Sequence, residues 1–236
     1  MDFQRLLEFC ATADSHTPQD DIRVRLPNVL RQAPQAFEQY EQSIERLDSQ
    51  TWEYVKQRLL QRTNKHPIRG WAQFYDTLAE VRGYCYLLDK GYTSVHFILE
   101  VDNAQTPDIE ATNTSRTGCL LESKSIGFSD DERNYILENT RRIGTGQTLA
   151  VRDVTQGMPQ GLKDKIENTV ISAKEQLLNY QPQNNSIKRI VYLTLHLDIH
   201  MFLDMQNYTE VVNFVRKLVR EETEVDIVID ELSSVR

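Results

Sequence analysis

Two acidic residues and a lysine have the types and spacing that chemistry at a phosphate would need. Asp108 follows Pro107 at the start of one short apolar run, and Glu122-Ser123-Lys124 ends the next. Side chains along a strand alternate in direction, so Glu122 and Lys124 should project from one face and Ser123 from the other. Adjacent strands lie about 4.8 Å apart, which would let Asp108 stand beside Glu122 and share a cation.

This arrangement favours a site for Mg²⁺ or Mn²⁺. Two carboxylates, the backbone carbonyl of Ser123 and several waters form the oxygen-only shell that Mg²⁺ prefers. Such an ion lowers the pKa of a bound water and stabilises charge on a scissile phosphate. Lys124 could orient the attacking water, assist its deprotonation or stabilise the charge that develops, and the sequence leaves these three roles open.

Structural explanations compete with this interpretation. Glu122 and Lys124 could form a surface cross-strand ion pair, which contributes less than about 1 kcal/mol. Asp108 could form part of a turn, because Pro-Asp is a common turn former. Four basic residues could contact phosphates, although a solvated face is the commoner role for such residues. They are Arg141, Arg142, Lys163 and Lys165.

A rival constellation follows a later apolar run. His196, Asp198 and His200 alternate along the chain, so all three could face one way and bind a transition metal. A hydrogen-bonded core histidine or a helix cap is the simpler explanation. The sequence contains no glycine-rich nucleotide-binding loop and no motif for a nucleophilic serine or cysteine.

The composition limits which classes of partner and which cellular compartment fit the chain. The 27 basic and 35 acidic residues give a net charge of −8, which argues against coating nucleic acid by charge alone. A local basic cleft or bound cations would still allow nucleic acid to bind. No apolar run approaches the roughly 20 residues that span a bilayer. Without a secretory signal or a CxxC motif, and with three scattered cysteines, the chain fits a reduced, cytoplasmic setting.

The first third of the chain predicts helices. Apolar residues recur at helical spacing in residues 3–10, 37–47 and 52–59. Asp48 or Ser49 could cap the last of these helices. A polar break at residues 63–67 follows. We therefore expect a helical extension over residues 1–66 and a second domain over residues 67–236.

The second region predicts alternating helices and strands. An apolar stripe from Trp71 predicts a helix that ends at Gly91, and alternation from Val95 to Val101 predicts a strand. Two short strands, a helix, a strand covered on both sides, a helix and a last strand should follow. Their expected ranges are 108–112, 119–124, 162–177, 190–195, 208–221 and 225–229. This order predicts an α/β fold with an N-terminal helical extension.

Pro107-Asp108 and Glu122-x-Lys124, about fourteen residues apart, resemble the signature of the PD-(D/E)XK nuclease superfamily. The surrounding order of helix, three strands, helix and strand resembles the restriction-endonuclease-like core of that superfamily. The resemblance spans roughly residues 71–198 and leaves the N-terminal third unexplained. It implies an α/β nuclease with this core and a helical extension.

The resemblance also implies supporting residues. Glu80, on the helix before the first strand, would be an additional metal-associated carboxylate. Gln176 and Tyr180 resemble a Q-x-x-x-Y element and share a helical face, where they would contact the nucleic-acid backbone or buttress Lys124. The structural alternatives are a solvated helix flank for Glu80 and ordinary helix-surface positions for Gln176 and Tyr180.

These features lead us to expect a Mg²⁺- or Mn²⁺-dependent nuclease that hydrolyses phosphodiester bonds by direct attack of water, on DNA in preference to RNA. The helical extension could guide the substrate, form a homodimer or recruit a protein partner, and no membrane association is expected. Two alternatives stay open. One is a binding or regulatory module that keeps the fold without cleaving. The other is a metallohydrolase centred on His196, Asp198 and His200.

Overall fold

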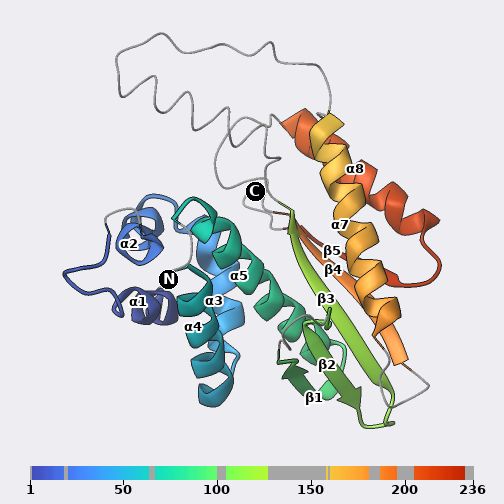
Figure 1. The fold of residues 1–236 in the computed structure, drawn as a ribbon, viewed down its shortest axis with the longest axis horizontal. Helices are drawn as coiled ribbons and strands as arrows, with labels where there is room; N and C mark the ends of the chain where they lie inside the picture. Colours follow the sequence, from blue (N-terminus) through green and yellow to red (C-terminus); the bar gives the residue numbers. More distant parts are fainter. Residues whose placement is uncertain are drawn as a thin grey trace.

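A five-stranded mixed sheet flanked by helices forms the centre of the molecule (Figure 1). The computed structural model describes residues 2–18, 21–63, 67–99, 105–126, 158, 160–180, 187–195 and 205–231. The α/β class expected from the sequence is confirmed. Within the described ranges, no helix combines the length and the hydropathy that a membrane crossing requires.

In the described ranges, four helices precede the long helix that leads into the sheet. They are α1 (Gln4–Cys10), α2 (Ile22–Gln32), α3 (Gln35–Glu45) and α4 (Ser49–Thr63). Asp48 caps α4, because its carboxylate accepts a hydrogen bond of 2.8 Å from the backbone N–H of Thr51. This bond satisfies one of the amide donors that the first turn of a helix leaves unpaired.

The long helix α5 (Pro67–Asp89) joins the N-terminal helices to the sheet. Its predicted apolar stripe is confirmed, since Phe74, Leu78 and Val81 are buried. Gly91 follows the end of the helix with a φ of +82°, a left-handed conformation that costs glycine little. The chain can therefore reverse at this point and enter the first strand directly.

The strands follow one another across the sheet in the order β1-β2-β3-β4-β5. They are β1 (Tyr92–Phe97), β2 (Ile109–Asn113), β3 (Gly118–Ile126), β4 (Ile187–Leu195) and β5 (Asp226–Glu231). The first three strands pair antiparallel, and β3, β4 and β5 pair parallel. Parallel neighbours need crossover connections, and these contain α7 (Gln160–Asn179) and α8 (Met205–Glu221).

The expected extent of the first strand is wrong. Alternation predicted a strand from Val95 to Val101, whereas β1 ends at Phe97, and Leu99 is 69% exposed. Phe97 pairs with Ile109, the first residue of β2, so the ladder has no partner residue in β2 beyond that point. Residues 100–104 lie outside the described ranges. One further backbone hydrogen bond, of 2.9 Å from Ile98 N–H to the Asp108 carbonyl, lies beyond the end of β1.

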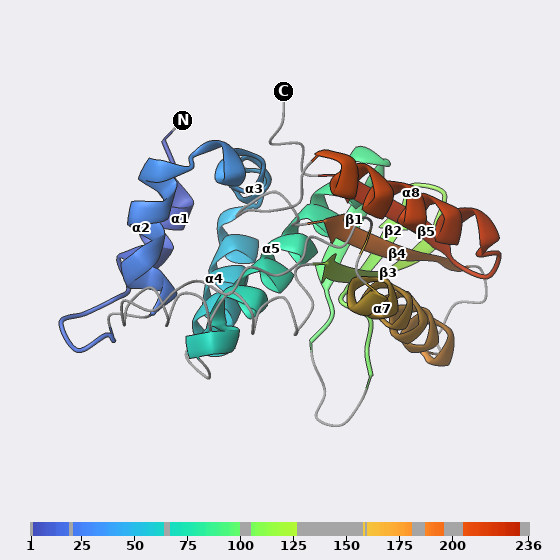
Figure 2. The same cartoon turned by 90° about the horizontal axis from the view of Figure 1, so that it is seen from above.

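Helices cover both faces of the sheet, with α5 on one face and α7 and α8 on the other (Figure 2). The near-continuous apolar run of β4 serves both layers, because Ile190 and Tyr192 join the core with α5 while Val191 and Leu193 join the core with α7 and α8. The predicted buried face of α7 is confirmed. Its residues are Leu162, Ile166, Val170, Ala173 and Leu177.

The N-terminal helices pack around α5 and share its core. One cluster of buried side chains runs from α1 through α5 to the first strands, and it includes Phe9, Phe37, Leu59 and Leu121. The expected domain boundary at residue 66 falls in residues 64–66, which lie outside the described ranges. The packing of α4 on α5 brings side chains of the extension toward the sheet.

The contact between α5 and β3 depends on Gly83. A Cβ atom at this position would lie 2.9 Å from Cδ2 of the fully buried Leu121. Alanine in a helix is favoured over glycine by about 1 kcal/mol, but overpacking a core costs about 1–3 kcal/mol. We therefore expect Gly83→Ala to lower the free energy of unfolding by about 1 kcal/mol, measured by urea denaturation.

Gly161→Ala is the matched control, because Gly161 is exposed in the first turn of α7. This variant should be neutral or slightly stabilising. An unfolding midpoint for Gly83→Ala at or above that of the unmodified protein would contradict the close approach of α5 to β3.

Candidate active site

A polar cleft of about 670 Å³ lies where α4, α5, β3 and α7 meet the segment that enters β2. Seven charged residues line it, and they come from regions far apart in the sequence. They are Arg58, Arg62, Asp76, Glu80, Asp108, Glu122 and Lys124. The cleft therefore contains the predicted Asp–Glu–Lys set, together with four further charged groups.

The register of β2 against β3 places Asp108 beside Glu122. Ile109 pairs with Leu121, so continuing the antiparallel register by one residue sets Asp108 opposite Glu122. A carboxylate oxygen of Asp108 accepts a 2.8 Å hydrogen bond from the backbone N–H of Ser123. The register therefore sets these two residues side by side at the point where the buried part of β3 ends.

Glu122 is buried, with 1% of its surface exposed. Its Oε1 atom accepts a charge-assisted hydrogen bond of 2.5 Å from Lys124 Nζ, and the Lys124 side chain is 30% exposed. The alternative of a surface ion pair is therefore wrong for this pair. The other oxygen of Glu122, Oε2, is buried and has no hydrogen-bond partner among the described residues.

Glu80 is also buried, so a solvated helix flank is not its environment. Two arginines of α4 contact its Oε1 atom, Arg62 at 2.7 Å and Arg58 at 3.3 Å. Arg58 also lies 3.8 Å from Oδ1 of Asp108. Glu80 Oε2, like Glu122 Oε2, is buried without a hydrogen-bond partner in the part of the chain that the structure describes.

Gln176 lines the cleft, and Tyr180 does not. The side-chain amide of Gln176 donates to the backbone carbonyl of Thr106, two residues before Asp108. Gln176 therefore holds the segment that leads into β2. Tyr180 is half-buried against the core beneath α7 and α8. Of the two predicted helix positions, the structure brings only Gln176 to the site.

Asp76 is a cleft residue that the sequence did not reveal. It lies one helical turn before Glu80 on α5 and accepts a hydrogen bond from the Ser125 hydroxyl. Its negative charge contributes to raising the pKa of Lys124. The spacing of Asp76 and Glu80 at i and i+4 was the available signal, because such residues share a helix face.

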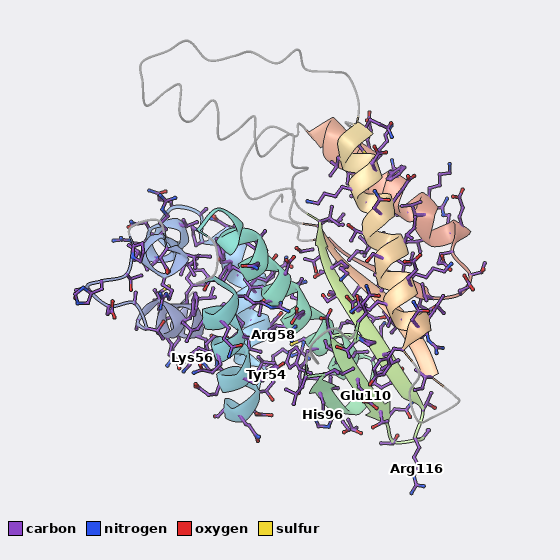
Figure 3. All side chains as sticks on the ribbon, viewed as in Figure 1. Tyr54, Lys56, Arg58, His96, Glu110 and Arg116 are labelled. Atoms are coloured by element: carbon purple, nitrogen blue, oxygen red, sulfur yellow. The ribbon has the colours of Figure 1, made fainter. Side chains whose placement is uncertain are left out.

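Arg58 and Arg62 were also missed. They too are spaced i and i+4 on α4, beside the buried Leu59, and Figure 3 labels Arg58. Their spacing predicts a shared face, but nothing local indicates that this face turns toward Asp108, which lies 50 residues further along the chain. Only the packing of α4 on α5 reveals it.

Burial and like charge dominate the electrostatics of the cleft. Burial and the nearby charge of Asp108 raise the pKa of Glu122 to about 8, against the opposing effect of Lys124. Burial and Asp108 likewise raise the pKa of Glu80 to about 8, although Arg58 and Arg62 oppose the rise. Burial also raises the pKa of Asp108. The carboxyl groups are thus crowded together without full compensation of their charge.

Lys124 stays protonated in this setting. Burial lowers its pKa, but the negative charges of Glu122, Asp108 and Asp76 outweigh that effect, so the pKa lies above its usual value. A protonated ammonium can donate to a water or to a phosphate oxygen, but it cannot accept a proton.

The donor atoms fit a hard divalent cation. Glu122 Oε2 and Glu80 Oε2 are buried oxygen acceptors without partners in the described ranges, and Asp108 stands beside Glu122. Oxygen-only ligands suit Mg²⁺ and Mn²⁺, and positive charge would relieve the crowding of the carboxyl groups. As the side chains stand, no three His, Cys, Asp or Glu residues within the described part converge on one metal position.

Other predicted residues lie away from the cleft or outside the described ranges. Lys163 and Lys165 are half-exposed on α7 and do not line the cleft, although the charge of Lys165 acts on Asp76. The remaining predicted residues, including those of the rival metal site, lie outside the described ranges. They are Arg141, Arg142, His196, Asp198 and His200.

Comparison with known proteins identified no relative of this chain. No family model matches the chain, and neither the curated proteins nor the solved structures gave a match. The functional interpretation therefore rests on the residues of this chain and on the geometry of the cleft.

The raised pKa of Glu122 predicts how stability depends on pH. An unfolded glutamate ionises near its ordinary value of 4.5, whereas folded Glu122 ionises at about 8. The folded protein binds more protons between these values, so the free energy of unfolding should fall as pH rises from 4.5 to 8. Glu122→Gln should reduce this fall by about 1 kcal/mol or more, measured by urea denaturation at several pH values.

Glu110→Gln is the control, because Glu110 is an exposed carboxylate on the neighbouring strand (Figure 3). It should leave the pH profile unchanged. A Glu122→Gln profile that falls as steeply as that of the unmodified protein would show that Glu122 ionises normally.

Proposed function

We propose that this protein is a divalent-metal-dependent nuclease that hydrolyses phosphodiester bonds, with DNA favoured over RNA. In this proposal α5, β1 to β3, α7 and β4 form a restriction-endonuclease-like core. The observation that carries the proposal is the buried, unpartnered oxygen of Glu122, in a cleft that also contains Asp108 and Lys124. An unpaired buried carboxylate oxygen costs stability, and a bound cation would offset that cost.

Asp108 and Glu122 would hold Mg²⁺ or Mn²⁺, with the Ser123 carbonyl as a third ligand and Glu80 in support. When bound, the ion would lower the pKa of a water and stabilise negative charge on the phosphate. The hydrogen bond from Ser123 N–H to Asp108 keeps this carboxylate directed toward the end of β3. Gln176 fixes the backbone before Asp108 and so contributes to its position.

Lys124 would orient the attacking water and stabilise charge on the phosphate. These two roles suit an ammonium whose pKa is raised by its acidic neighbours. Deprotonation of the water by Lys124 would require a neutral amine, which this environment disfavours. The geometry thus favours two of the three roles that the sequence left open.

Cleavage of nucleic acid is the direct test. Purified protein should nick circular duplex DNA and degrade linear DNA with Mg²⁺ or Mn²⁺, and a chelator should stop both reactions. Glu122→Gln should lower the rate at least about 100-fold, because it removes a metal ligand while keeping the shape of the side chain. Glu110→Gln, which alters an exposed carboxylate outside the cleft, should cleave normally.

Further outcomes separate the alternatives. Cleavage that survives Glu122→Gln but is lost in His196→Ala would favour the metallohydrolase centred on His196, Asp198 and His200. An absence of cleavage with every divalent ion, for DNA and for RNA, combined with capture of a macromolecular partner, would favour the non-catalytic module.

Metal binding can be tested apart from activity. A ligand that binds only the folded state stabilises it, by about 2.7 kcal/mol at a concentration 100-fold above its dissociation constant. Mn²⁺ should therefore raise the thermal unfolding midpoint of the protein. Asp108→Asn and Glu122→Gln should lose most of this rise, and Glu110→Gln should keep it. Equal rises in all four proteins would place the ion elsewhere.

A further inference from the structure

Two arginines of the N-terminal extension line the cleft beside the predicted metal ligands. Arg58 and Arg62, the α4 arginine pair, are one helical turn apart on α4. Both guanidinium groups contact the same oxygen of Glu80. Arg58 also lies 3.8 Å from Oδ1 of Asp108, so the pair places two positive charges among the carboxyl groups of the cleft.

We propose that the α4 arginine pair binds a backbone phosphate of the nucleic acid next to the scissile bond, so that the N-terminal extension completes the substrate site in cis. This inference rests on the proposed nuclease function and names residues that contact its substrate. Arginine suits the role because its planar donors match phosphate oxygens in a bidentate geometry.

The balance of charge in the cleft supports the proposal. Its lining includes four carboxyl groups, of Asp76, Glu80, Asp108 and Glu122, and three cationic groups, of Arg58, Arg62 and Lys124. The pKa values of Glu80 and Glu122 are raised to about 8, and a bound divalent cation would favour the ionised form of both groups. With all seven groups ionised and the cation bound, the net charge is +1, which matches one phosphodiester. Without Arg58 and Arg62 the net charge would be −1 even with the cation bound.

The two arginines differ in their access to the cleft. The side chain of Arg62 is 23% exposed, which leaves it within reach of a ligand, whereas that of Arg58 is 8% exposed. Arg62 also donates to the Thr77 hydroxyl at 3.3 Å. Arg62 is therefore the residue through which the pair is best tested.

Aromatic packing holds Arg58 in place. Its guanidinium donates to the Tyr54 hydroxyl at 3.2 Å, and the Tyr54 ring stacks on Phe97 of β1 with ring centroids 5.5 Å apart. Phe97 stacks in turn on Tyr84 of α5. These contacts join α4 to the sheet beside Arg58, which lies one helical turn from Tyr54 on α4 (Figure 3). Such preorganisation reduces the entropy that an arginine loses when it binds an anion.

The test measures binding of a short labelled DNA duplex in the presence of Ca²⁺, a hard cation that also prefers oxygen ligands. Affinity is recorded from about 50 to 200 mM salt, because each phosphate contact contributes about 0.9 to the slope of log affinity against log salt. Arg62→Gln should weaken binding roughly tenfold at the lowest salt and reduce the slope by about one contact. Arg62→Lys keeps the charge and should retain the slope.

Two controls accompany Arg62→Gln. Arg116→Asn removes one arginine from the exposed β2–β3 turn, where the φ of +61° is a conformation that asparagine tolerates, and it should leave affinity and slope unchanged (Figure 3). Glu80→Gln removes the carboxylate that the pair contacts. If Arg62 served only to hold Glu80, Glu80→Gln would reproduce the smaller salt slope of Arg62→Gln, whereas loss of metal support alone would lower the affinity and keep the slope.

Each outcome decides between the two proposals. A lower affinity with a smaller salt slope in Arg62→Gln, and an unchanged slope in Glu80→Gln, support the phosphate contact, whether or not the protein cleaves. Unchanged binding in Arg62→Gln, with metal-dependent cleavage by the unmodified protein, overturns the phosphate contact and leaves the nuclease proposal standing. A protein that neither binds nor cleaves DNA or RNA overturns both.

Discussion

The pairing of β2 with β3 is the constraint on which the cleft depends. Its antiparallel register places two carboxyl groups, of Asp108 and Glu122, opposite one another where the sheet is buried. Burial raises the pKa values of both groups, and the charge of Asp108 adds to the rise at Glu122. Two cationic side chains partly compensate this negative charge. Lys124 of β3 pairs with Glu122, and Arg58 of α4 lies near Asp108. A cation held by the carboxyl groups would complete the compensation.

The helices before the sheet pack in the same core as α5 and the first strands. Their core continues into α5, and α5 packs closely on β3 because Gly83 lacks a side chain. Arg82, the preceding residue, forms a partly buried ion pair with Asp230 of β5, and its guanidinium also donates to the backbone carbonyl of Gln39 in α3. The helix is thereby attached to both the extension and the far strand. This attachment holds α4 where its arginines reach the cleft.

Sequence periodicity predicted most of the elements, because each depends on which face of a short segment is buried. The buried face of α7 and the two-sided burial of β4 follow directly from the spacing of apolar residues. The same reasoning extended β1 too far, since the end of a strand depends on its partner and the ladder stops where β2 begins. Likewise, a shared helix face could be inferred for Gln176 and Tyr180, but not that only Gln176 would reach the cleft.

The sequence by itself determined most of the elements, although not α2, and the local order of Asp108, Glu122 and Lys124, because alternation and strand spacing act over a few residues. Only the tertiary structure decided what surrounds them. The burial of Glu122 and the arrival of Arg62 from α4 arise from helices packing across the end of the sheet. Contacts between residues many positions apart leave no periodic signal in either segment. A local pattern can therefore nominate a carboxylate for chemistry, while its charge environment depends on the whole fold.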